Sequence, residues 1–132
     1  MPCLIDSNIV IDRLSEDAQI VQFLSGIAPL GLAISVVTYM EVYQGIFRVL
    51  DPDRLAADLD AFVADAPIPP LTPAAARRCA ELRHVLDRRD RRVRTRSLDL
   101  VTAAIALEFD HALVTRNHAD YADVPGLAIV TP

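Results

Sequence analysis

The sequence contains no lysine, and all thirteen of its cationic side chains are arginines. This absence excludes chemistry that needs a lysine amine, such as Schiff-base catalysis and phosphate binding by a P-loop. Tryptophan is absent too, and aromatic residues make up only 5% of the chain. With so few rings, we do not expect an aromatic platform on which single-stranded bases could stack.

Cysteines and long apolar runs are also scarce. Cys3 and Cys79 have no CxxC spacing, so we expect free, buried thiols in a reducing cytoplasm. The longest charge-free run, within residues 21–40, is broken by two glycines and a proline, and a membrane span needs about 20 apolar residues. No basic segment precedes an apolar core at the start, so we expect no signal peptide.

The charge is unevenly distributed along the chain. The net charge is −5, yet nine of the thirteen arginines fall within residues 77–96. The sequence therefore predicts an acidic protein with one basic flank.

The order of apolar and helical patterns predicts the fold class. Short apolar runs predict strands at 3–5, 32–34, 111–114 and 127–130, and the proline-rich segment 67–70 permits only a short edge-type strand. Helical patterns lie between them, at 9–14, 17–25, 35–50, 51–64, 73–86 and 97–109. The alternation predicts a single α/β domain over residues 1–132, a three-layer α/β/α sandwich around a parallel sheet of four to five strands.

The helix expected at 35–50 raises two further questions. Tyr43, Phe47 and Leu50 are expected in the core, with a dimer or partner surface as the alternative. A glycine in a helix interior lowers helix stability by about 1 kcal/mol relative to alanine. Gly45 therefore predicts that another backbone approaches the helix closely at this position.

Acidic and amide side chains recur where these elements meet one edge of the sheet. Asp6 ends the first strand, and Glu41 lies in the helix after the second. Asp99 lies in the first turn of a later helix, and Asn117 with Asp120 follows the strand before last. Because right-handed crossovers bring the carboxyl ends of parallel strands to one edge, we expect these side chains to gather there.

Carboxylates gathered in this way need a counter-charge. Two like charges 4 Å apart cost about 4 kcal/mol at an effective dielectric near 20, so either their pKa values rise or a cation neutralises them. The three histidines lack metal-ligand spacing, and an all-oxygen donor set suits Mg²⁺ or Mn²⁺ rather than Zn²⁺. Such a cation can lower the pKa of a bound water and hold a phosphodiester.

Four motifs together resemble the successive signatures of PIN-domain proteins, most closely the VapC-type toxins of bacterial toxin–antitoxin pairs. The resemblance spans the whole chain. The motifs are Asp6-Ser7-Asn8, Ser35-x-x-Thr38-x-x-Glu41, Asp99-Leu-Val-Thr-Ala-Ala and Thr115-Arg-Asn-x-x-Asp120-Tyr.

The resemblance implies an Mg²⁺-dependent endoribonuclease (Mn²⁺ being an alternative ion), usually a homodimer and neutralised by a cognate VapB-type antitoxin. The implied catalytic acids are Asp6, Glu41, Asp99 and Asp120, and the implied metal ligands are these four with Asn117. Whether Asn117 or Asp120 completes the site stays open. Supporting polar groups would be Ser7, Asn8, Thr38 and Thr115. Tyr121 stands where phenylalanine is commoner in the family, and we expect this change to alter packing alone.

A ribonuclease with a net negative charge needs a local cationic surface for RNA phosphates. The candidates for RNA binding are Arg88, Arg89, Arg91, Arg92, Arg94, Arg96 and Arg116. Antitoxin docking is the rival use of this basic segment.

Two rival functions fit parts of this sequence. A phosphorylated receiver domain also has an acidic pocket, but it needs a lysine near the end of its sheet. A catalytically silent PIN module that only binds partners remains the alternative.

Overall fold

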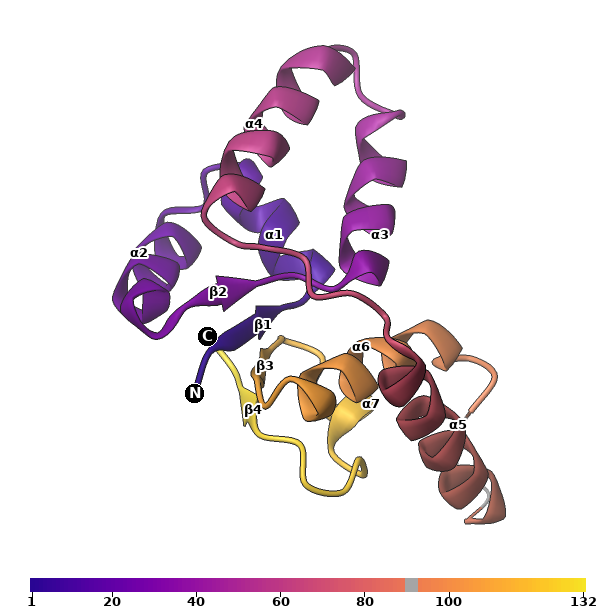
Figure 1. Cartoon of the computed structure of the whole chain (residues 1–132). Helices are drawn as coiled ribbons and strands as arrows, with labels where there is room; N and C mark the ends of the chain where they lie inside the picture. The colour runs from indigo at the N-terminus through magenta and orange to yellow at the C-terminus, as the bar shows by residue number, and fades with distance from the viewer. Residues whose placement is uncertain (90–92) are drawn as a thin grey trace.

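The molecule is built on a parallel sheet of four short strands (Figure 1). The structure, a computed structural model, describes residues 1–89 and 93–132. The strands are β1 (Cys3–Ile5), β2 (Leu32–Ala33), β3 (Ala112–Val114) and β4 (Ile129–Val130), in the spatial order β2-β1-β3-β4. All three strand pairs are parallel. This confirms the predicted α/β class with a parallel central sheet.

The prediction of a short edge strand at residues 67–70 is wrong. This segment is irregular, and it meets the end of β2 through a hydrogen bond from the Ile34 N–H to the Pro67 carbonyl, 3.1 Å long. Prolines 67, 69 and 70 have no N–H group, so the segment cannot form a ladder of hydrogen bonds.

Helices connect the strands, and most begin where the capping residues indicate. The Asp17 carboxylate accepts hydrogen bonds from the N–H groups of Gln19 and Ile20, and the Thr72 hydroxyl accepts one from the N–H of Ala75. Asp6 caps the first helix, which begins at Ser7, two residues before the expected start at residue 9. The helices are α1 (Ser7–Leu14), α2 (Ala18–Ile27), the 3₁₀ turn η1 (Ala28–Leu30), α3 (Val36–Ile46), α4 (Pro52–Ala64), α5 (Pro73–Arg88), α6 (Ser97–Glu108) and α7 (His118–Tyr121).

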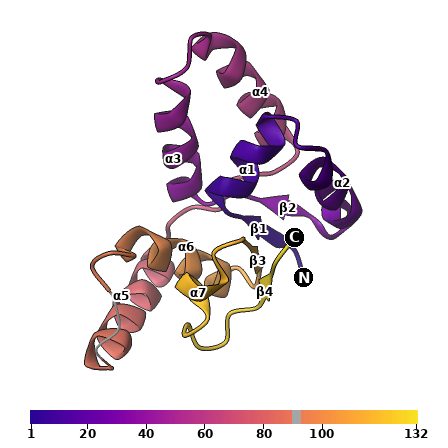
Figure 2. The same cartoon turned by 180° about the vertical axis from the view of Figure 1, so that it is seen from behind.

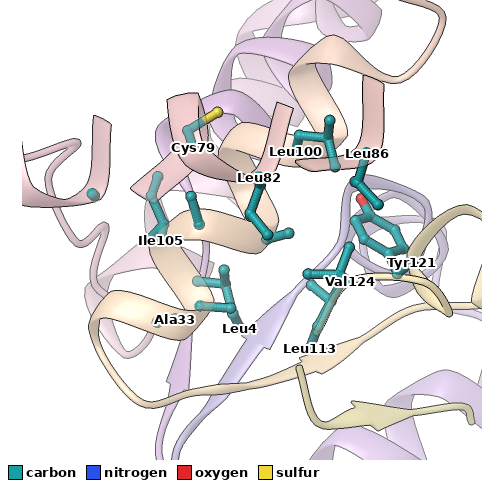
Figure 3. Close-up of a cluster of buried hydrophobic side chains, with 14 residues drawn as sticks. Leu4, Ala33, Cys79, Leu82, Leu86, Leu100, Ile105, Leu113, Tyr121 and Val124 are labelled. Carbon is teal, nitrogen blue, oxygen red and sulfur yellow. The ribbon is translucent and has the colours of Figure 1, made fainter. Parts of the chain in front are cut away.

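The helices cover both faces of the sheet (Figures 1 and 2). Side chains of a strand alternate between faces, so Leu4 and Leu113 pack with α5 and α6, the cluster drawn in Figure 3. Cys3, Ile5 and Val114 pack on the other side with α1 to α4. The result is the predicted three-layer sandwich.

Both cysteines are free and buried, as predicted. Burial raises the pKa of each thiol above its ordinary value, which keeps the thiol protonated and unreactive. Among the described residues, no helix combines the length and the apolar character that a membrane crossing requires.

The helix expected at 35–50 ends early, at Ile46. Phe47 is 76% exposed and Leu50 is fully exposed, so placing them in the core was wrong, whereas Tyr43 is partly buried against the α1–α4 cluster. A Cβ added at Gly45 would have no atom within 4 Å, so the expected backbone approach is wrong as well. The reason is that α3 and α4 form a hairpin extending away from the sheet (Figure 1).

Candidate functional site

Asp6 is fixed at the carboxyl edge of the sheet by both of its carboxylate oxygens. Oδ1 accepts a hydrogen bond of 2.9 Å from the Ser7 N–H, and Oδ2 accepts one of 2.7 Å from the Thr115 hydroxyl. Thr115 follows β3 directly, and β3 pairs with the strand that Asp6 ends. Asp6 as a whole is 5% exposed, and its carboxylate retains lone pairs for a further ligand.

Glu41 approaches Asp6 from α3. Its backbone position is set by Val42 and Ile46, which follow it in the helix and pack in the core. The pKa of Glu41 is raised above its ordinary value, chiefly by burial and further by the negative charges of Asp6 and Asp99. A hydrogen bond from the Ser7 side chain partly offsets this rise in pKa.

Asp99 completes the group from the first turn of α6. Its pKa is raised, first by burial and then by Asp6 and Asp120, while the Tyr121 hydroxyl and Arg96 act in the opposite direction. Asp6, Glu41 and Asp99 therefore lie within electrostatic range of one another, although 93 positions separate the first from the last in the sequence.

A chain of buried hydroxyl groups joins the helices that carry Glu41 and Asp99. The Ser35 hydroxyl caps α3 by accepting from the Thr38 N–H, and it lies 3.0 Å from the Thr102 hydroxyl of α6. Ser35 also donates to the Thr38 hydroxyl at 3.3 Å. Thr38, expected to support water or metal, thus lies fully buried in a link between α3 and α6.

Asp120 lies beside this group on α7, whereas Asn117 and Asn8 are exposed. The Asn117 N–H donates to the Thr115 hydroxyl at 3.0 Å, and its carbonyl accepts from the Asp120 N–H at 3.0 Å. Asp120 carries enough charge toward Asp99 to raise the pKa of that residue. Of Asn117 and Asp120, the Asp120 carboxylate is therefore the one that acts electrostatically on Asp99.

A buried arginine holds this last segment against α6. The Arg96 guanidinium donates two hydrogen bonds to the Asp123 carboxylate, 2.6 and 2.7 Å long, and a third of 2.9 Å to the Asp120 carbonyl. Arg96 is 5% exposed, so expecting it on an RNA-binding surface was wrong: its charge is used inside the protein.

The sequence model of one family covers nearly the whole chain. The model described as PIN domain matches residues 3–127. The chain belongs to the PIN domain family. No curated protein matches it significantly.

Solved structures with the fold of this PIN domain come from bacterial complexes. VapBC2 from Rickettsia felis, bound to a DNA fragment from its promoter, has a TM-score of 0.89 at 21% identity, covering 100% of this chain and 99% of that one. VapBC from Salmonella typhimurium, also bound to DNA, has 0.87 at 23% identity, covering 99% and 98%. VapBC-5 from Mycobacterium tuberculosis has 0.69 at 28% identity, covering 99% and 98%.

The donor set of this PIN domain fits a hard divalent cation, because it consists of carboxylate, amide and hydroxyl oxygens. Within residues 1–89 and 93–132, no three Asp, Glu, His or Cys side chains lie close enough to hold an ion between them. An ion would therefore be held partly through its own waters, as Mg²⁺ commonly is.

Apart from Arg96, the arginines expected to bind RNA in this PIN domain divide into three groups. Arg88, Arg89 and Arg94 are exposed at the end of α5 and in the turn before α6. Arg116 forms an ion pair with Asp12 on α1. Arg91 and Arg92 lie outside the described residues.

Two residues received no role from the sequence alone: Thr102, although it stands in the motif Asp99-Leu-Val-Thr-Ala-Ala, and Asp123. Thr102 had one signal, its place three residues after Asp99 in the same turn-and-a-half of helix. Asp123 had none, because its partner Arg96 is 27 positions away in an irregular segment.

Proposed function

We propose that this PIN domain is an Mg²⁺-dependent endoribonuclease toxin that cleaves RNA phosphodiester bonds and is neutralised by a VapB-type antitoxin. The observation that carries the proposal is the group formed by Asp6, Glu41 and Asp99. Burial and mutual repulsion raise the pKa values of Glu41 and Asp99. The raised values show that the ionised carboxylates are unfavourable together, and a bound cation would remove this repulsion. The similar VapBC complexes support the toxin–antitoxin part.

Some residues of the site would bind the cation, and others orient the carboxylates that bind it. Asp6, Glu41 and Asp99 would hold Mg²⁺ or Mn²⁺, with Asp120 or Asn117 completing the set. When bound, the cation supplies a water of lowered pKa and charge neutralisation for the phosphate. Thr115 and the Ser7 N–H fix the Asp6 carboxylate by their two hydrogen bonds, so Asp6 is oriented before any ligand arrives.

The RNA phosphates would approach along the exposed arginines that precede α6. Arg88, Arg89 and Arg94 lie in the segment that leads into the helix carrying Asp99. Each phosphate contact would make RNA binding weaker at higher salt. Arg116 would contribute only after releasing Asp12.

Two surfaces suit the proposed protein partners. A cleft of about 470 Å³ between α1, α2 and α4, with Leu14, Leu24 and Phe62 among its lining residues, would receive the antitoxin. The exposed apolar residues along one side of α3 and just beyond it would join two copies into a homodimer; these residues are Val36, Met40, Phe47 and Leu50.

The test is RNA cleavage by the purified protein with Mg²⁺ or Mn²⁺, and with EDTA. Asp6→Asn and Asp99→Asn should each reduce cleavage at least about a hundredfold while the circular dichroism spectrum stays unchanged. Asp60→Asn, on the exposed side of α4, is the matched control and should cleave like the unmodified protein. Full activity of either site variant would contradict the proposal.

A silent partner-binding module is the second candidate. It is favoured by the absence, among the described residues, of three acids close enough to hold an ion directly. Calorimetric titration with Mn²⁺ separates the two functions, because a silent module would give no binding heat.

A further inference from the structure

Tyr121 ends α7, and its ring belongs to the core between the sheet and α5 and α6. The side chain is 1% exposed. Figure 3 draws it close to Leu86 and Val124, with its hydroxyl oxygen at the end of the ring nearer Leu86. The packing of the ring needs no hydroxyl group, and phenylalanine would provide it equally well.

Packing does not explain the Tyr121 hydroxyl group. It is buried, and within the described residues it makes no hydrogen bond of ordinary geometry. A buried polar group without a partner lowers the stability of a folded protein. Phenylalanine would fill the same space without that cost, so packing does not account for the oxygen.

The surroundings of the hydroxyl are acidic. Asp99, on the helix that packs against α7, interacts with it most directly, and Asp6 and Glu41 lie within electrostatic range. A tyrosine hydroxyl is uncharged at neutral pH. The group is therefore an O–H donor, buried within electrostatic range of three carboxylates.

We propose that Tyr121 is a positioning residue, whose hydroxyl donates a hydrogen bond to the Asp99 carboxylate when the site binds its divalent cation. A carboxylate has enough lone pairs to accept this bond and also face a cation. Hydrogen bonds to metal ligands orient them and strengthen metal binding. The inference rests on the proposed function and revises the expectation that Tyr121 alters packing alone.

The test compares Tyr121→Phe with Tyr43→Phe, which removes a hydroxyl from a partly buried tyrosine of α3. Thermal melting with and without Mn²⁺, and calorimetric titration with Mn²⁺, are measured for both variants and the unmodified protein. Without metal, Tyr121→Phe should melt no lower than the unmodified protein, because it loses no well-formed hydrogen bond. Its Kd for Mn²⁺ should rise roughly tenfold, and its Mn²⁺-induced rise in Tm should shrink. Tyr43→Phe should change neither.

Two results would overturn the inference. One is an unchanged Kd for Mn²⁺ in Tyr121→Phe with an unchanged metal-free Tm, which would leave the hydroxyl without a role. The other is an unchanged Kd with a lower metal-free Tm, which would mark a purely structural role. Failure of the proposed function looks different, because the unmodified protein itself would then show neither binding heat nor a shift in Tm. In that case there is no cation for Tyr121 to serve, and the inference fails with it.

Discussion

The hydroxyl groups of Ser35 and Thr102 lie 3.0 Å apart, although 67 positions separate the two residues in the chain. Ser35 begins α3 and Thr102 lies early in α6, so this buried contact fixes the two helices to each other near the ends that face the acids. The distance between Glu41 and Asp99 therefore depends on this contact.

Replacing Thr102 with valine keeps the volume but removes the hydroxyl. We expect the free energy of unfolding to fall by about 1–2 kcal/mol, because the buried Ser35 hydroxyl loses a partner. RNA cleavage should fall as well, since α3 and α6 are less firmly joined. Urea denaturation checks the first effect. Thr131→Val, at an exposed position, is the control, and an equal loss in both variants would contradict the prediction.

The Arg96–Asp123 pair should matter far more than a surface pair. Arg96→Met leaves the charge of Asp123 partly buried, and we expect a loss of about 3 kcal/mol in the free energy of unfolding. Arg78 pairs with Glu108 at 2.9 Å, but its side chain is 47% exposed. Arg78→Met should cost less than about 1 kcal/mol. Chemical denaturation of both variants makes the comparison, and equal losses would refute it.

The raised pKa of Glu41 makes the stability of the metal-free protein depend on pH. The folded state holds this proton more tightly than the unfolded state, whose pKa is near 4.5. The contribution of Glu41 to stability is therefore greatest below that pH and is lost as the pH rises through its folded-state pKa. Glu41→Gln should raise Tm at pH 7 and lose this advantage near pH 4.

Thermal melting of the metal-free variant across this pH range is the measurement. Added Mn²⁺ should reverse the difference at pH 7, because the unmodified protein alone keeps the full set of carboxylates. A variant that is less stable than the unmodified protein at every pH would count against an acidic cluster under repulsion.

Gly45→Ala should stabilise the protein by about 0.5–1 kcal/mol, since alanine is the better helix former and the added methyl group meets no atom within 4 Å. Gly126 is the contrasting position, because its φ of +78° is one that alanine adopts with strain. Gly126→Ala should lose about 1 kcal/mol. Equilibrium unfolding measures both, and a destabilised Gly45→Ala would show that this helix face has a neighbour.

Local patterns were enough to predict the strands and the edge at which Asp6, Glu41 and Asp99 meet. These features could be predicted because the apolar run of a strand, the residue that caps the next helix and the pattern of that helix each lie within a short stretch of sequence. The pairing of Arg96 with Asp123 could not be predicted, because it joins two irregular segments with no fixed spacing. The exposure of Phe47 and Leu50 was missed for another reason: an apolar stripe on a helix looks the same whether it faces a core or a partner.

The hydrogen bond from Thr115 to Asp6 also determines when the site can form during synthesis. Cys3 is made long before its strand partner Ala112, which lies 109 positions later in the chain. Asp6 therefore stays without its threonine donor until residue 115 has emerged from the ribosome. A nascent chain shortened before residue 115 has no means of completing the cluster, so the activity of the proposed toxin begins only after the chain has grown past that residue.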